Sequence, residues 1–180
     1  MEALREACHL RVGIPLKPML AKPTKGVAII LKRFEDIRFT CEYKYDGFRG
    51  QIHFYREEGL DQPTVAIYSR NLENMTQAYP DVVSFLQKHI DQNKITDFIL
   101  DVELVAYDKT QDKILPFQLL TQRSRKNVKS EDLETIVCLH AFDLLYLNGE
   151  SLLKKNFIER RTTLHSTFEI SKGHFHFAKY

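Results

Sequence analysis

Four stretches of the chain are rich in β-branched and aromatic residues, and apolar and polar positions alternate along much of them. This composition and this period of two are typical of strands that are buried on at least one face. The pattern predicts strands at residues 39–55, 64–70, 98–107 and 135–147.

Apolar positions at helical spacing predict a few helices between and around these strands. The expected helices are residues 26–37, a helix that begins at Pro80, and residues 157–168. The prolines between Ile14 and Pro23 favour an extended segment before the first of these helices. Because strands dominate and helices are irregularly placed, we expect an α+β fold with largely antiparallel sheets and flanking helices.

Length and composition set only broad limits on the fold and the function of the chain. A chain of 180 residues, 43% hydrophobic and 28% charged, suits one folded domain and excludes a largely disordered protein. The net charge of +2, from 26 basic and 24 acidic residues, does not by itself indicate nucleic acid. Three scattered cysteines suggest neither a disulfide framework nor a zinc site. Without a signal segment or a long apolar run, we expect an intracellular protein with no membrane partner.

The segment before Phe48 places one lysine between two acids. If residues 39–46 form a strand, Glu42, Lys44 and Asp46 share its polar face. One interpretation is a solvated face that ends in a hairpin turn at Asp46 and Gly47. The other is a nucleophilic lysine, beside a glycine that lets a nucleotide approach the backbone.

The wider sequence decides between these interpretations. Residues 44–49, KYDGFR, match the KxDGxR pattern of the covalent nucleotidyltransferases, which are the DNA ligases, RNA ligases and mRNA capping enzymes. Further blocks agree in order and spacing: GIPLKPMLAKPTKG at 13–26, YSRNLENMTQAYPDV at 68–82, FILDVELVAYD at 98–108, LPFQLLTQRSRK at 115–126 and CLHAFDLLYLNGESL at 138–152. Over nearly its whole length the chain resembles the eukaryotic ATP-dependent DNA ligases of the ligase I type.

This resemblance implies a covalent nucleotidyltransferase (ATP-grasp-like DNA ligase) fold and a role for each matching residue. Lys44 would attack the α-phosphate of ATP and carry AMP, Glu42 would lie against the adenine, and Arg49 would hold the ribose and phosphate oxygens. Glu103 would contact the ribose and a Mg²⁺ ion, which prefers carboxylate oxygen. Phe142 would stack on the adenine, although a strand phenylalanine is by default a core residue.

The resemblance also implies contacts with nicked duplex DNA. Arg70 would approach the 5′-phosphate side of the nick, Phe117 would enter the minor groove, and Arg123 and Arg125 would contact the DNA backbone. Each has a simpler interpretation. Arg70 could belong to a polar turn, Phe117 could be a core residue, and the basic cluster could be solvated loop charge.

The same resemblance shapes our expectations for the whole protein. Residues 1–13 would be the tail of a preceding helical domain or a linker. Residues 14–180 would be the N-terminal part of an adenylation domain, truncated before its last strands and before an oligonucleotide-binding domain. We expect a monomeric nuclear ligase that acts in DNA replication, repair and recombination with ATP and Mg²⁺. The alternatives are a capping-type guanylyltransferase, or a DNA-binding fragment without catalytic activity.

Overall fold

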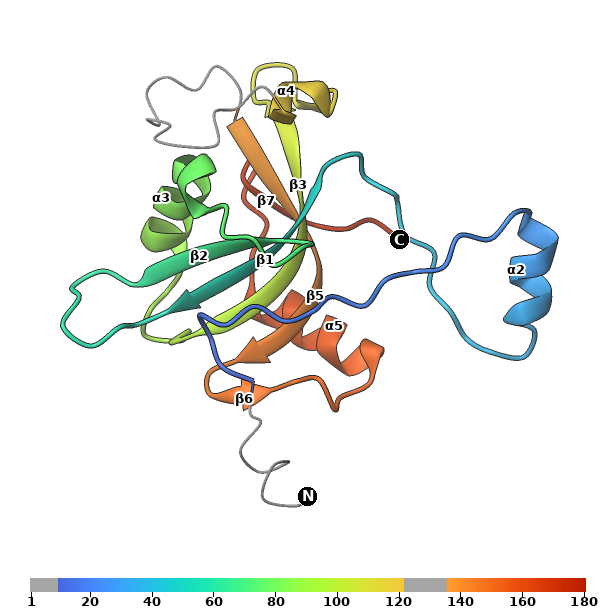
Figure 1. Cartoon of the computed structure of the whole chain (residues 1–180), viewed down its shortest axis with the longest axis horizontal. Coiled ribbons are helices and arrows are strands. Elements are labelled where there is room, and N and C mark those ends of the chain that lie inside the picture. The colour runs from blue at the N-terminus through green and yellow to red at the C-terminus, as the bar shows by residue number, and fades with distance from the viewer. Residues whose placement is uncertain (1–9, 122–135) are drawn as a thin grey trace.

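Long antiparallel strands form the centre of the computed structural model, which describes residues 10–121 and 136–180. In this part of the chain the strands join in one seven-stranded sheet of order β2-β1-β3-β5-β6, with β4 paired to β3 and β7 paired to β5 (Figure 1). Among the described strands, only β5 and β7 pair in parallel. The strands are β1 Phe48–Tyr55, β2 Thr64–Ser69, β3 Phe98–Asp108, β4 Lys113–Ile114, β5 Ile136–Leu147, β6 Glu150–Ser151 and β7 Phe175–Phe177.

Short helices flank this sheet, as the sequence predicted. They are α2 Val27–Arg33, the 3-10 turn η1 Thr76–Ala78, α3 Pro80–His89, α4 Gln118–Thr121 and α5 Phe157–Thr167. Helix α3 packs near β2, whereas α5 runs along β5 (Figure 1). The α+β class with a largely antiparallel sheet is therefore confirmed.

One face of β3 supplies the middle of the hydrophobic core. Leu100, Val102 and Leu104 are fully buried there. They pack with residues of β1 and β5 and with buried side chains of both flanking helices, among them Leu86 and Leu164. Because side chains alternate across a strand, Asp101 and Glu103 lie on the opposite face. This alternation, which the sequence predicted, makes β3 the strand that separates the core from the polar site.

The predicted first strand is wrong in its first half. Residues 39–47 belong to no strand, and β1 begins only at Phe48. A strand needs a hydrogen-bonded neighbour, and between residues 39 and 47 the described backbone forms one such bond, from Tyr43 N–H to Lys179 O at 3.0 Å. Asp46 and Gly47 form a bend that leads into β1, so they are not the turn of a hairpin either.

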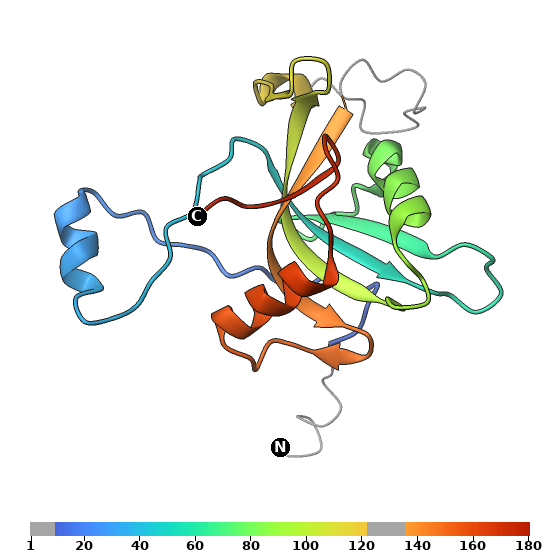
Figure 2. The same cartoon turned by 180° about the vertical axis from the view of Figure 1, so that it is seen from behind.

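The first helix is present but is shorter than residues 26–37, and it buries none of its residues. Val27 is 70% exposed, and α2 projects away from the sheet in both views (Figures 1 and 2). Helix α3 begins at Pro80 as predicted, and α5 begins at Phe157 as predicted and ends one residue before the expected end at 168. In the described residues no helix is long and apolar enough to cross a membrane.

Candidate active site around Lys44

A glycine brings the Lys44 segment against the central strand. A Cβ atom on Gly47 would lie 2.3 Å from the backbone oxygen of Leu104, and 3.0 Å from side-chain atoms of Glu103 and Val105. Only a residue without a side chain fits here. The close approach sets Lys44, three residues earlier, beside the polar face of β3.

Lys44 itself is exposed and lies close to one carboxylate of β3. Its Nζ donates a hydrogen bond to its neighbour's carbonyl, Tyr45 O, at 3.3 Å. Glu103 is half-buried, and burial raises the pKa of its carboxyl, whereas the charges of Lys44 and Arg49 and a hydrogen bond from the Gly47 backbone oppose that rise. The nucleophile candidate and the predicted metal ligand therefore act on each other electrostatically.

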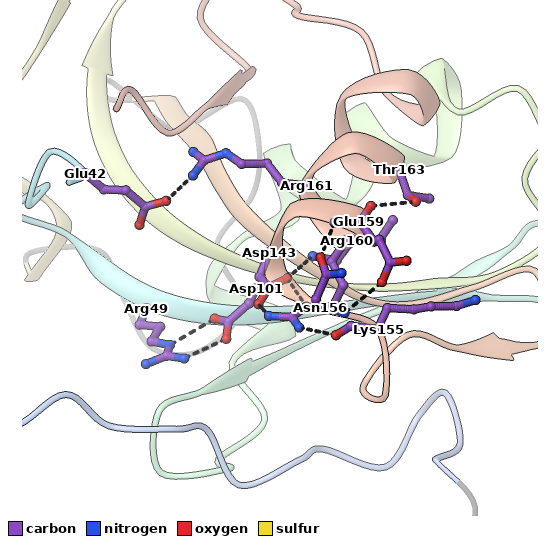
Figure 3. Close-up of polar contacts among 11 residues, drawn as sticks. Glu42, Arg49, Asp101, Asp143, Lys155, Asn156, Glu159, Arg160, Arg161 and Thr163 are labelled. Atoms are coloured by element: carbon purple, nitrogen blue, oxygen red, sulfur yellow. Dashed lines mark hydrogen bonds and ion pairs between the residues drawn. The ribbon is translucent and has the colours of Figure 1, made fainter. Parts of the chain in front are cut away.

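Arg49 is held by an acid to which the sequence had assigned no role. Asp101 accepts hydrogen bonds from Nε and Nη2 of Arg49, at 2.9 and 2.7 Å (Figure 3). The hydrogen bond that Arg49 donates to Asp101 raises the pKa of the guanidinium. A third donor, Nη1, bonds to Met19 O at 2.9 Å. Such a two-pronged pair fixes the plane of the guanidinium as well as its position.

A bulge in the sheet sets Phe142 beneath this guanidinium. The β3–β5 register shifts between Asp101 and Val102, so that Asp101 pairs with Asp143 and Val102 with Ala141, and Phe142 falls between. Arg49 Cζ lies 5.4 Å from the centroid of the Phe142 ring, a distance typical of a cation–π contact. A half-buried phenylalanine that faces a charged group does not behave as a simple core residue.

Glu42 lies apart from this group and points toward helix α5. Its carboxylate accepts a hydrogen bond from Nη1 of Arg161 at 2.7 Å (Figure 3). Arg161 also donates to Ala178 O and lies 4.1 Å from the centroid of the Tyr180 ring. The sequence analysis missed Arg161, because a helical arginine far along the chain carries no local signal of this contact.

A cavity near this group is lined by other residues and does not contain Lys44. It has a volume of about 620 Å³ and lies between the segment before Cys41, the start of α5 and the C-terminal Tyr180. Phe39, Ile158 and Arg161 are among the residues that line it. Lys44 is exposed and Arg49 and Glu103 are half-buried, so these polar side chains reach the surface of the described part of the chain.

The residues predicted to contact DNA are not all described. Arg70 is exposed directly after β2, in a turn where Ser69 Oγ accepts hydrogen bonds from two backbone N–H groups, and within the described ranges no acid pairs with it. Phe117 is half-buried, packs against the core, and has its ring centroid 4.7 Å from that of Phe48. Arg123 and Arg125 lie outside the described residues.

One of the two carboxylates on the polar face of β3 is suited to contact Mg²⁺. Among the residues that the structure describes, no group of three or more possible ligands could hold a metal ion. Asp101 is occupied by Arg49, which leaves Glu103 as the available acid on this face of β3. Mg²⁺ commonly takes only one or two protein carboxylates and completes its shell with substrate phosphates and water, so Glu103 fits such an ion.

Comparison with known proteins identifies the group to which this arrangement belongs. The model of a family described as "ATP dependent DNA ligase domain" matches residues 18–180. The chain belongs to the ATP-dependent DNA ligase family. This agrees with the resemblance found in the sequence.

Two proteins named DNA ligase 1 are similar in sequence to this chain over almost its whole length. DNA ligase 1 of Arabidopsis thaliana is 51% identical over 175 residues, which cover 97% of this chain and 21% of that protein. DNA ligase 1 of Dictyostelium discoideum is 49% identical over 180 residues, which cover the whole chain and 15% of that protein. The chain thus spans about a fifth or less of the length of these relatives.

A solved structure supports the fold independently of these close relatives. A mycobacterial DNA ligase D complexed with ATP and MES superposes with a TM-score of 0.53 at 26% identity, over 69% of this chain and 35% of that one. The chain therefore has part of the architecture of a DNA ligase nucleotidyltransferase domain.

Proposed function

We propose that Lys44 is the residue that takes AMP from ATP. The observation that carries this proposal is the group around it: Lys44 beside Glu103, with Arg49 fixed by Asp101 above the Phe142 ring. Lys44 supplies an amine nucleophile, and the Glu103 carboxylate is suited to a metal ion. The permanent charge of Arg49 is suited to phosphate oxygens, and the face of the Phe142 ring is suited to a purine base.

In the proposed reaction, the neutral Lys44 amine attacks the α-phosphorus of ATP. A P–N bond forms, the P–O bond to pyrophosphate breaks, and a proton passes from the amine to solvent water. Glu103 would hold a Mg²⁺ ion, which would supply positive charge to the phosphate oxygens. Arg49 would contribute a fixed positive charge to the same oxygens.

The two acids near Lys44 in the sequence differ in their contacts. The charge of Glu42 is paired with Arg161 at 2.7 Å. Asp46 remains exposed next to Lys44. Glu42 is still proposed to meet the adenine, which would require it to turn from Arg161 or to share its carboxylate.

For the complete protein we propose DNA joining, in which the AMP is passed from Lys44 to the 5′-phosphate of a nick before the nick is sealed. The family and its DNA ligase relatives support this role, and with it action in replication and repair. Arg70, Phe117, Arg123 and Arg125 are the proposed DNA contacts. A monomeric, nuclear protein with a further oligonucleotide-binding domain remains a prediction from the family.

Incubation with ATP labelled at the α-phosphate, in Mg²⁺, tests the adenylation step. We expect label from ATP but not from GTP to remain on the denatured protein, and Lys44→Arg to abolish it although the charge is kept. Lys94→Ala, which changes an 83% exposed lysine of a surface ion pair, serves as the matched control. Label from GTP would favour a capping-type enzyme, and label retained in Lys44→Arg would exclude Lys44.

A further inference from the structure

Residues 41–47 carry Lys44 but belong to no strand, so the regular ladder of the sheet does not hold them. One end is fixed where Gly47 passes Leu104. The middle bonds to the C-terminal segment: Lys179 O accepts from Tyr43 N–H at 3.0 Å, and Lys179 N–H donates to Tyr45 Oη at 3.2 Å. Glu42 pairs with Arg161 of α5, and a further contact is made by the Tyr45 ring.

That ring lies against a histidine in the middle of β5. The ring centroids of Tyr45 and His140 are 4.2 Å apart, with 34° between their planes. His140 is only 6% exposed, and His176 of β7 stacks on it at 5.5 Å. His140 and His176 are direct partners in the parallel β5–β7 ladder. Two neighbouring strands therefore build the platform on which Tyr45 rests.

His140 makes its contacts through the faces of its ring. Neither ring nitrogen has a hydrogen-bond partner among the described residues. Burial lowers the pKa of His140 to about 4, so the ring is uncharged at neutral pH. An uncharged, buried aromatic ring with no polar partner is suited to packing against another ring.

The platform also has a fixed relation to Glu103. His140 and Glu103 are direct partners in the antiparallel β3–β5 ladder, so their side chains leave the same face of the sheet. Lys44 is the immediate neighbour of Tyr45, and its Nζ bonds to Tyr45 O. The Tyr45 contact thus links the nucleophile to the strand pair that carries the proposed metal ligand.

We propose that Tyr45 and His140 are positioning residues that hold Lys44 at the correct place relative to Glu103. This inference rests on the proposed role of Lys44 as nucleophile. The role of His140 is the shape of its ring, not its nitrogen chemistry. A phenylalanine should therefore replace it, whereas an alanine should not.

The test compares His140→Ala and His140→Phe with the unchanged protein, in two measurements. The first is the single-turnover rate of lysyl-AMP formation as a function of ATP concentration. The second is amide hydrogen exchange across residues 41–47. His165→Ala is the matched control, because it removes a histidine that also stacks on an aromatic ring, Phe177 at 4.0 Å, but from the exposed side of α5.

We expect His140→Ala to slow adenylation at saturating ATP by about 10- to 100-fold, the range that a displacement of roughly 1 Å can cause. The ATP concentration for half-maximal rate should change little, and exchange at residues 41–47 should become faster. His140→Phe should restore both measurements, and His165→Ala should change neither. Thermal unfolding of each variant separates these effects from loss of the fold.

Two results would overturn the inference. If His140→Phe were as slow as His140→Ala, a ring nitrogen would be needed and the platform role would be wrong. If His140→Ala matched the unchanged protein in rate and exchange, Tyr45 would not depend on it. Absence of lysyl-AMP in the unchanged protein would instead refute the proposed function, while the exchange measurement would still decide whether His140 orders the segment.

Discussion

Asp101 holds Arg49 in a two-pronged ion pair across two neighbouring strands of the sheet. The Asp101 side chain is 7% exposed and that of Arg49 25% exposed, so the acid is buried and the guanidinium reaches the surface. An acid buried in an apolar strand is stabilised only when it is paired. The pair thus explains why β3 can carry a carboxylate in its middle, and it directs a positive charge toward the face on which Lys44 lies.

Loss of the Asp101 charge should impair both stability and adenylation. Asp101→Asn keeps the shape but leaves Arg49 with a weaker partner. We expect a loss of stability below the roughly 3–5 kcal/mol typical of breaking a fully buried pair, because Arg49 is partly exposed. Lysyl-AMP formation should fall by about 10-fold or more. Thermal unfolding and the labelling assay measure the two effects. Glu150→Gln, which breaks an exposed pair with Lys155, should change neither.

Gly47 should tolerate no side chain. In Gly47→Ala the new Cβ would meet the Leu104 carbonyl, which cannot move without disturbing the centre of β3. We expect adenylation to fall by at least about 10-fold as the Lys44 segment is pushed away. Gly50→Ala is the informative comparison, because there the nearest atom, at 2.5 Å, is the end of the Leu104 side chain. A smaller loss of adenylation in Gly50→Ala would support this reason, and equal losses would contradict it.

Acid should destabilise the fold through a buried histidine. His53 is fully buried, its Nδ1 accepts from Gly13 N–H at 3.0 Å, and its Nε2–H donates to Gln51 Oε1 at 3.0 Å. Gln51 in turn accepts a hydrogen bond from Leu16 N–H and donates one to Leu16 O, so these bonds connect residues 13–16 to β1. Protonation would place a second N–H against that of Gly13.

The direction of the change in stability with pH follows from the lowered pKa of His53. Burial lowers the pKa of His53 from 6.5 to about 4. The unfolded chain therefore binds the proton more readily, and stability should be constant above about pH 7 and fall between pH 6.5 and about 4, by on the order of 3 kcal/mol for this group. Unfolding midpoints across this pH range measure the fall. His53→Gln, which cannot titrate, should reduce the slope, and an unchanged slope would assign it to other groups such as His140.

Arg70 should contribute to DNA binding through phosphate and not through bases. Arg70→Ala is expected to weaken binding to nicked duplexes of different sequence about equally, and to reduce the slope of log affinity against log salt by about 1. Binding titrations at several salt concentrations measure both quantities. Arg56→Ala changes an arginine whose Nη2 bonds to Gln92, and serves as a comparison of equal charge. A sequence-dependent loss would contradict a pure phosphate contact.

The linear order of residues was enough to identify the family and much of the fold. The apolar and polar alternation along residues 98–107 correctly separated Leu100 and Leu104 from Asp101 and Glu103, because a strand that is buried on one face imposes its period on the sequence. The match of KYDGFR to the family pattern singled out Lys44 and Arg49 as candidate site residues.

Tertiary structure decided how these residues meet. No local pattern could show that Asp101 pairs with Arg49, that Arg161 engages Glu42 from 119 residues away, or that Tyr45 rests on His140. Residues 39–47 alternate like a strand but lack the hydrogen-bonded neighbours that would make them one, because strand formation depends on a partner as well as on the sequence itself. The candidate site residues could thus be proposed from the sequence, whereas the partners that orient them depended on which strands and helices lie side by side.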